Sequence, residues 1–260
     1  IETHADTRGA ALIRCAELDA VRPWVFLERP IALVHVLEVG NVVHVDLLAE
    51  PRLIENRYHV HAGHGDVVAL RTGLELGEPG AGDAGYQRGL ALCNRSEHDG
   101  AIAEFVTQGF NGVALLSKHP LEDVTRGLPG DDTDPQSRWI EALVPFDKQM
   151  IRVASLYLPN GNPIGTEKFA YKLAWMERLK RHTRALLDDE TPLVMAGDYN
   201  VIPEPQDAKR PEAWVNDALF QPESRRAYRA LLNLGLTDAT RACHPEPGLY
   251  TFWDYQAGAF

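Results

Sequence analysis

The stretch Leu193-Val-Met-Ala-Gly-Asp-Tyr-Asn200 decides the fold, because it joins four apolar residues to a glycine and then to polar residues. The apolar run predicts a buried strand that ends at one rim of a sheet. Residues i and i+2 of an extended chain point to the same side, so we expect Asp198 and Asn200 to converge on one small charged group. A phosphate together with a divalent metal ion suits this carboxylate and amide.

Two further segments have the same design, an apolar or β-rich run that ends in polar or aromatic groups. They are Ser155-Leu-Tyr-Leu-Pro-Asn-Gly-Asn162 and Tyr250-Thr-Phe-Trp-Asp-Tyr255. Together with the first stretch they predict one active-site rim. Taken alone, Asp198 and Asn200 are equally consistent with turn residues that cap their own backbone.

Composition limits the classes of protein that this chain can belong to. A length of 260 residues with 45% hydrophobic content allows a large core in one or two domains. The apolar runs are shorter than the roughly 18 residues of a membrane span, so we expect a cytoplasmic protein without membrane contact. Three scattered cysteines fit a reducing compartment. The net charge of −11 argues against binding nucleic acid by bulk electrostatics, although an enzyme needs only a local basic patch.

The chain changes character near residue 105. No lysine precedes Lys118 and no methionine precedes Met150, although residues 31–37 and 42–48 have strand-like patterns. Three interpretations remain open for residues 1–104: an extra domain, a diverged half of the catalytic domain, or translation from the wrong reading frame. We favour the third, and sequencing the locus tests it. We therefore expect an unassigned segment over residues 1–104 and a partial catalytic domain over residues 105–260.

Local signals after residue 105 predict alternating strands and helices, which favours helix layers on a sheet. Phe169, Leu173, Met176, Leu179, Thr183 and Leu186 recur at spacings of three and four, which predicts an amphipathic helix capped by Thr166. A loop is expected from Lys118 to Gln136. The expected strands are residues 111–117, 139–144, 151–158 and 193–198, and the expected helices are residues 166–188 and 222–234.

Six motifs occur in a fixed order: Asn111-Gly-Val-Ala-Leu-Leu-Ser117, Arg138-Trp-Ile-Glu141, Ser155 to Asn162, Gly197-Asp-Tyr-Asn200, Gly235-Leu-Thr-Asp238 and Tyr250 to Tyr255. In this order they resemble the exonuclease III type of abasic-site endonuclease, within the endonuclease/exonuclease/phosphatase superfamily, over about residues 105–260. The resemblance implies an α/β (α+β) fold, a four-layer sandwich of two mixed β-sheets flanked by helices. We expect this sandwich to be incomplete at both ends.

The resemblance also implies roles for three catalytic residues. Tyr157 would contact or polarise the scissile phosphate, Asp198 would orient and deprotonate the attacking water, and Asn200 would stabilise charge on the phosphorus oxygens. In-line attack on a phosphodiester requires such a base and such donors. From the residues alone, Tyr157 is equally consistent with a core tyrosine of a strand.

Five residues are expected to bind nucleic acid. Asn160 would hold a phosphate oxygen, and Phe252 with Trp253 would form the wall of the pocket for the base-free sugar, although core packing is an alternative for Trp253. Arg138 and Lys168 are candidate phosphate contacts.

Lys172 is a further candidate phosphate contact, because it lies one helical turn beyond Lys168. The alternative interpretation of these two lysines is that they are solvated residues on the outer face of the helix, and this is the one that we favour.

The metal site is the least complete part of the resemblance. Asp198 and Asn200 are the candidate ligands for Mg²⁺ or Mn²⁺, whereas the family's metal-binding glutamate and its C-terminal aspartate have no counterpart in the chain. Thr240 also stands where many members have an aromatic residue.

The sequence thus predicts a metal-dependent DNA repair nuclease that incises duplex DNA 5′ to an abasic site and trims 3′ ends. Two alternatives remain open: a catalytically inactive fragment of that family, and a superfamily phosphodiesterase that acts on a lipid, inositol or RNA substrate. The expected partner is duplex DNA with abasic sites or 3′ ends, and the expected oligomeric state is a monomer.

Overall fold

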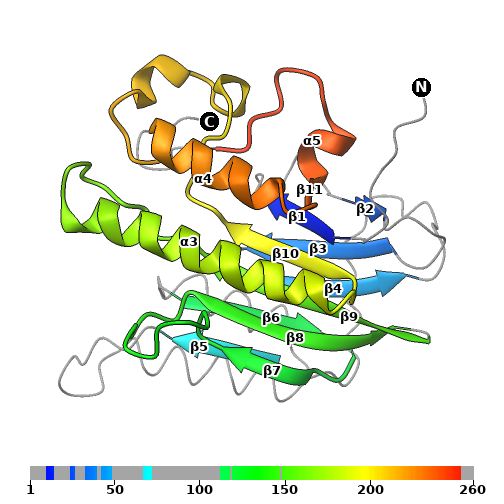
Figure 1. Ribbon diagram of the computed structural model, residues 1–260. Coiled ribbons are helices and arrows are strands. Elements are labelled where there is room, and N and C mark those ends of the chain that lie inside the picture. The colour runs from blue at the N-terminus through cyan, green and yellow to red at the C-terminus, as the bar shows by residue number, and fades with distance from the viewer. Residues whose placement is uncertain are drawn as a thin grey trace, which may run out of the picture.

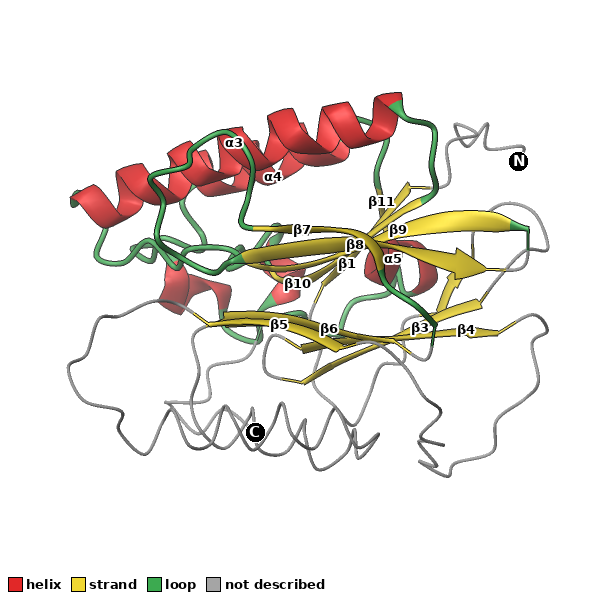
Figure 2. Ribbon diagram, turned by 90° about the horizontal axis from the view of Figure 1, so that it is seen from below, coloured by secondary structure: helices red, strands yellow, loops and turns green. Residues whose placement is uncertain are grey.

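The structure is a computed structural model that describes residues 10–14, 24–26, 33–39, 42–48, 67–71, 112–117, 119–146 and 148–252. These residues form two mixed β-sheets, with two long helices on the outer face of one sheet (Figure 1). The mixed α/β fold predicted from the sequence is therefore confirmed. In the described part, a layer of helices and two layers of strands lie on top of one another (Figure 2).

The first sheet carries the candidate site. Its strands are arranged in the order β11-β1-β10-β9-β8-β7, with β10 parallel to both of its neighbours and β8 antiparallel to β9 and β7. The central β10 is buried along most of its length, as its apolar sequence predicts. The six strands are β1 (Ala10–Arg14), β7 (Glu122–Arg126), β8 (Trp139–Phe146), β9 (Gln149–Tyr157), β10 (Leu193–Asp198) and β11 (Thr237–Asp238).

The second sheet has the order β2-β3-β4-β6-β5 and packs against the first through contacts of β10 with β3 and β4 and of β6 with β8 and β9. Its strands are β2 (Trp24–Phe26), β3 (Leu33–Val39), β4 (Val42–Leu48), β5 (Val67–Arg71) and β6 (Gly112–Ser117). The strand patterns expected near residues 31–37 and 42–48 correspond to β3 and β4.

Strands from both parts of the chain pair with each other. β1 lies beside β10, and β4 lies parallel to β6, so residues before 72 and residues after 111 share both sheets. This pairing of strands does not test whether residues 1–104 have a separate origin. Their separate origin stays a prediction, with the sequence of the locus as its test.

The long helix α3 (Glu167–Asp188) covers the first sheet together with α4 (Pro222–Leu232). Thr166 occupies the expected N-cap position of α3, but its side chain does not cap the helix, because its hydroxyl donates to the Pro163 carbonyl oxygen at 2.7 Å. Most of the predicted apolar stripe is buried, but Phe169 and Leu173 are only partly buried, because Lys172 and Trp175 occupy the buried face there. At the N-terminal end of the helix, the buried face is therefore slightly rotated from the predicted apolar stripe.

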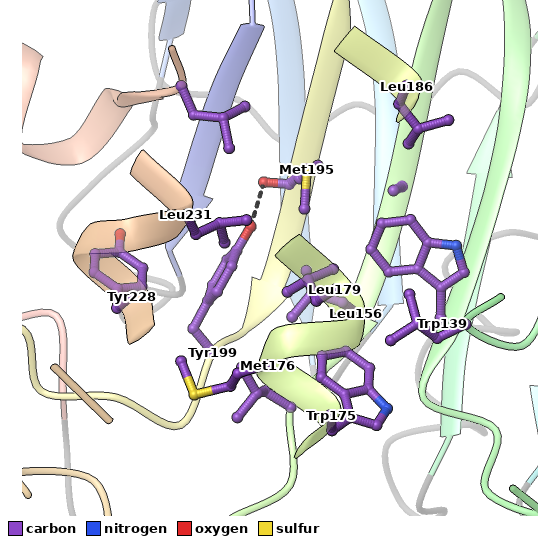
Figure 3. Close-up of a cluster of buried hydrophobic side chains, with 14 of the residues drawn as sticks. Trp139, Leu156, Trp175, Met176, Leu179, Leu186, Met195, Tyr199, Tyr228 and Leu231 are labelled. Carbon is purple, nitrogen blue, oxygen red and sulfur yellow. Dashed lines mark hydrogen bonds between the residues drawn. The ribbon is translucent and has the colours of Figure 1, made fainter. Parts of the chain in front are cut away.

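One continuous core joins α3 and α4 to the sheet. Trp139, Leu156 and Met195 contribute from the strands, and the Tyr199 hydroxyl donates to the Met195 carbonyl oxygen at 3.2 Å (Figure 3). Trp175 and Leu179 contribute from α3. This core fixes the strand ends that carry the candidate site.

The strand β7 corrects the expectation of an uninterrupted loop from residue 118 to Gln136. Its five residues include a single apolar side chain, and its burial is low, because it is the edge strand of the sheet. Backbone pairing to β8, with a register shift between Glu122 and Thr125, holds it in place. A hydrophobic pattern does not report a strand of this kind.

The described helices include none that is long and apolar enough to cross a membrane.

Candidate active site at the ends of strands β9 and β10

The site forms where two parallel strands end side by side. Asp198 is paired in register with Tyr157, and the Leu158 amide donates to the Asp198 carbonyl oxygen at 2.8 Å. Gly197 makes this approach possible: its φ is +142°, and an added Cβ would lie 2.0 Å from the Leu156 carbonyl oxygen. The prediction of a buried strand that ends in polar residues is thus confirmed.

Asp198 and Asn200 form a tight turn. The Asn200 amide donates to Asp198 Oδ1 at 2.7 Å, and Asn200 Nδ2 donates to Asp198 Oδ2 at 2.8 Å. Asn200 has a φ of 45°, a left-handed conformation that asparagine tolerates better than most residues. The turn-capping interpretation therefore describes the local geometry correctly, and the same contacts orient the carboxylate.

The Asn200 side chain connects its own turn to the segment that follows β9. Its Nδ2 also donates to the Leu158 carbonyl oxygen at 2.9 Å, and its Oδ1 accepts from Asn160 Nδ2 at 3.1 Å. Both amide hydrogens of Asn200 thus have protein acceptors. In this conformation the side chain positions Asp198 and Asn160, which differs from the direct phosphate contact expected from the sequence.

Lys172 lies beneath these residues, so the expectation that it is solvated is wrong. Its exposed fraction is 0%, and its Nζ donates to the Asn160 carbonyl oxygen at 3.0 Å and to the Asn200 carbonyl oxygen. Gly161 makes room for it, because an added Cβ at Gly161 would lie 2.6 Å from Lys172 Cδ. Lys172 precedes Met176 by four residues, and this spacing is the signal in the sequence that could have indicated its burial.

Burial changes the protonation of both ionisable groups at the centre of the site. Burial lowers the pKa of the Lys172 ammonium to about 7, against the opposing effect of the Asp198 and Asp217 carboxylates. Burial raises the pKa of the Asp198 carboxyl, against the hydrogen bonds from Asn200 and the charges of Lys172 and Arg138. Each shift has the sign expected when water is removed from a charged group.

Arg138 is in contact with Tyr157. Its guanidinium carbon lies 4.7 Å from the centroid of the Tyr157 ring, and its NH1 donates to the Tyr157 carbonyl oxygen at 3.1 Å. In return, the Tyr157 amide donates to the Arg138 carbonyl oxygen at 2.9 Å. The Tyr157 side chain is partly exposed, so it is not the core tyrosine of the alternative interpretation.

A third loop joins the site through Asn162. Its Nδ2 donates to Asp217 Oδ2 at 3.0 Å, and its Oδ1 accepts from the Ala218 amide at 2.9 Å. Asp217 also accepts from the Leu219 amide at 2.9 Å. The loops that follow β9 and precede α4 are therefore connected, which the sequence spacing did not indicate.

The remaining predicted residues lie farther from this network. The Phe252 ring packs edge-on against Trp214, with ring centroids 4.6 Å apart, in a cluster with Ile202 and Leu219. Lys168 is exposed in the first turn of α3. Trp253 lies outside the described residues.

The described residues contain no group of three or more His, Cys, Asp and Glu side chains arranged to hold a metal ion. Among the described residues, Asp198 is the carboxylate that is hydrogen-bonded to Asn200, and Asp217 is joined to the site through Asn162. Any cation bound here by the described residues would therefore take most of its ligands from water and from the substrate.

Comparison with known proteins gives consistent results. A family model described as the Endonuclease/Exonuclease/phosphatase family matches residues 32–259. The chain is 31% identical over 155 residues to an exodeoxyribonuclease of Bacillus subtilis, an alignment that covers 59% of each protein. It is 33% identical over 153 residues to DNA repair nuclease APEX1 of Danio rerio, covering 58% of this chain and 47% of that protein.

A solved structure of the 3′ phosphatase NExo from Neisseria, bound to a product DNA hairpin, is also similar. Its TM-score is 0.54 at 36% identity, with 58% of this chain and 57% of that chain covered. The chain spans 59% and 47% of the lengths of the two curated relatives. The resemblance predicted from the six ordered motifs is confirmed by these matches.

Proposed function

Because the chain belongs to the endonuclease/exonuclease/phosphatase family, we propose that it is a metal-dependent DNA repair nuclease that hydrolyses phosphodiester bonds. Its substrates would be duplex DNA with abasic sites, incised 5′ to the lesion, and 3′ ends. The names of an exodeoxyribonuclease and a DNA repair nuclease among its relatives support this assignment. The observation that carries it is the Asp198 carboxylate, held by Asn200 beside Tyr157 at the ends of two parallel strands.

The described side chains suit in-line attack of water on a phosphodiester. Asp198 would act as the base that orients and deprotonates the water, since both of its oxygens are fixed by the Asn200 turn. The Tyr157 hydroxyl would donate to a phosphate oxygen, with the ring held by Arg138. Asn160 would hold a second phosphate oxygen from the adjacent loop.

We propose Mg²⁺ or Mn²⁺ as the cofactor. Mg²⁺ in phosphoryl-transfer sites is bound by one or two carboxylates together with phosphate oxygens and water, so a donor set with one carboxylate fits it. Asp198 and the side-chain amide oxygen Oδ1 of Asn200 are the described groups that would hold the ion. When bound, the cation supplies positive charge next to the oxygens that become negative during the reaction.

The proposal extends to the layers of the fold, the cellular compartment and the oligomeric state. We propose a four-layer sandwich, in which a second helix layer covers the outer face of the β2-β3-β4-β6-β5 sheet. We also propose a cytoplasmic monomer, which the small number of cysteines and the net charge of −11 support.

The central test compares Asp198→Ala with the unmodified chain on a duplex that contains one abasic site, in the presence of Mg²⁺. Loss of a general base is expected to reduce the rate of cleavage by about 100- to 10,000-fold. Asp132→Ala, which removes an exposed carboxylate from a loop, is the control and is expected to cleave at the unmodified rate. Equal cleavage by the unmodified chain and Asp198→Ala would remove Asp198 from the mechanism.

A second candidate is a chain that binds DNA without cleaving it. The observation that favours it is that the described residues include no group of three or more His, Cys, Asp and Glu side chains that could hold a metal ion. In that case the unmodified chain would bind the abasic duplex without cleaving it at any Mg²⁺ or Mn²⁺ concentration. If inositol phosphates compete for the site and abasic duplex does not, the substrate is a molecule other than DNA.

A further inference from the structure

A buried ion pair outside the proposed catalytic residues joins three segments of the chain. Asp207, in the 3-10 helix η1 (Pro205–Asp207), has an exposed fraction of 1%. Arg241, in the short helix α5 (Ala239–Cys243), donates to Asp207 Oδ1 from NH2 at 2.7 Å and from Nε at 3.2 Å. A buried charged pair with two hydrogen bonds is a geometrically specific contact.

Asp207 also holds the segment that ends at Phe252. Its Oδ1 accepts from the Thr251 hydroxyl at 2.8 Å, and its carbonyl oxygen accepts from the amides of Thr251 and Phe252, both at 3.0 Å. Its Oδ2 accepts from the Glu204 amide at 2.9 Å. One residue thus receives hydrogen bonds from its own turn, from α5 and from a segment more than forty residues away.

Arg241 completes the attachment. Its NH2 donates to the Leu249 carbonyl oxygen at 2.7 Å, and its NH1 donates to the His244 carbonyl oxygen at 3.2 Å. The segment from Leu249 to Phe252 is therefore held at its start by Arg241 and at its end by Asp207. A guanidinium suits this task, because its planar fork donates in several fixed directions at once.

The contacts of Asp207 and Arg241 with the segment from Leu249 to Phe252 fix the position of the Phe252 ring. Phe252 packs against Trp214 of η2 (Pro211–Trp214) and joins the cluster of Ile202 and Leu219. Ile202 follows the catalytic turn by two residues, and its amide donates to the Leu219 carbonyl oxygen at 2.9 Å. Phe252 is thus connected to the Asn200 turn through packed side chains and one backbone hydrogen bond.

We propose that Asp207 and Arg241 are a positioning pair that sets the aromatic wall at Phe252, and that this wall makes the site prefer a base-free sugar over an intact nucleotide. The inference rests on the proposed function and adds the residues that determine its selectivity. A displacement of about 1 Å in a site can reduce the rate about 100-fold, so the fixed position of the wall matters as much as its chemistry.

The test measures binding in the presence of EDTA, so that cleavage does not interfere, to an abasic duplex and to the same duplex without the lesion. Asp207→Asn is expected to lower the preference for abasic duplex by about tenfold, while affinity for the intact duplex stays the same. Glu204→Gln, in the same turn but with an exposed ion pair to Arg225 and Arg229, is the matched control and keeps the preference.

Arg241→Lys keeps the positive charge but loses the planar guanidinium, so we expect it to lose part of the preference for abasic duplex. This second variant also tests the proposal if Asp207→Asn does not fold. General destabilisation would weaken binding to both duplexes equally. A preference within about twofold of the unmodified chain in both variants would overturn the proposal.

Hydrogen exchange separates failure of this inference from failure of the proposed function. The Thr251 and Phe252 amides are expected to exchange faster in Asp207→Asn than in the unmodified chain, whatever the substrate is. Unchanged exchange would contradict the positioning pair. If these amides exchange faster in Asp207→Asn but the unmodified chain shows no preference for abasic duplex, the positioning pair is supported and the proposed substrate is contradicted.

Discussion

The helix α3 buries two cations, and the two differ in what they bind. Lys172, near its N-terminal end, donates to backbone carbonyl oxygens of the two loops at the candidate site. Arg178, two turns later, pairs with the carboxylates of Asp134 and Asp131 in the loop before β8. The hydrogen bonds of Lys172 go to neutral carbonyl oxygens, although the Asp198 and Asp217 carboxylates favour its charged form, whereas Arg178 is bonded directly to carboxylates. We infer that Lys172 organises the site and that Arg178 stabilises the fold.

Arg178→Met tests the stabilising half of this comparison and has the largest expected effect. It leaves the Asp134 carboxylate, with a side chain only 5% exposed, without its cation. Removing one partner of a buried pair costs about 3–5 kcal/mol, which urea unfolding would measure. Arg181→Met, at an exposed position of the same helix, is the control. A loss as small as that of the control would show that the pair contributes little.

Lys172→Met tests the organising half. The apolar side chain replaces a buried ammonium, so we expect little change in the free energy of unfolding. The loops that carry Asn160 and Asn200 lose their common donor, and kcat/KM on abasic duplex is expected to fall about 100-fold. Lys180→Met, on the same helix, is expected to leave kcat/KM unchanged. A large loss of stability with unchanged kcat/KM would reverse the roles assigned to the two cations.

Gly161→Ala addresses the space that Lys172 needs. The φ of +88° and the 2.6 Å approach to Lys172 Cδ both oppose a methyl group at this position. We expect a loss of about 1–3 kcal/mol in the free energy of unfolding, together with reduced cleavage. Gly165→Ala has a similar φ of +77° but no atom within 4 Å, so the difference between the two variants isolates the contact. Equal losses would mean that backbone strain alone is responsible.

Tyr171→Phe gives the smallest expected effect and reports on the Arg178 side of the helix. Burial, together with the Asp134 carboxylate, raises the pKa of the Tyr171 hydroxyl to about 12. A pKa raised above its unfolded value gives stability that is present below pH 10 and is lost as the pH rises toward 12. The urea midpoint of the unmodified chain should therefore decrease more steeply over this range than that of Tyr171→Phe. Parallel decreases would contradict the contact.

The parts that could be predicted from the sequence are those with a regular hydrophobic period. β10, β9 and α3 lie where their apolar patterns place them, and α3 begins after Thr166 as predicted, although the Thr166 side chain makes no capping hydrogen bond. β7 was missed because an edge strand depends on backbone pairing rather than on side-chain burial.

The candidate site was only partly predictable for a similar reason. Asp198, Asn200 and Tyr157 are brought together because two strand ends carry them. The contacts of Lys172 and Arg138 with backbone carbonyl oxygens depend on tertiary structure, and a sequence pattern reports residue types rather than acceptors. The assignment of Lys172 to a solvated face failed because the predicted stripe ran through Phe169 and Leu173, whereas the buried face of the helix runs through Lys172 and Trp175.

The pairing of Asp198 with Tyr157 on neighbouring parallel strands has one more consequence. Adjacent strands of a sheet keep a spacing of about 4.8 Å, whatever their loops contain. The separation between the proposed base and the proposed phosphate contact is therefore a property of the sheet. A change of length in the surrounding loops would therefore alter the access of a substrate to the site without changing the distance between these two residues.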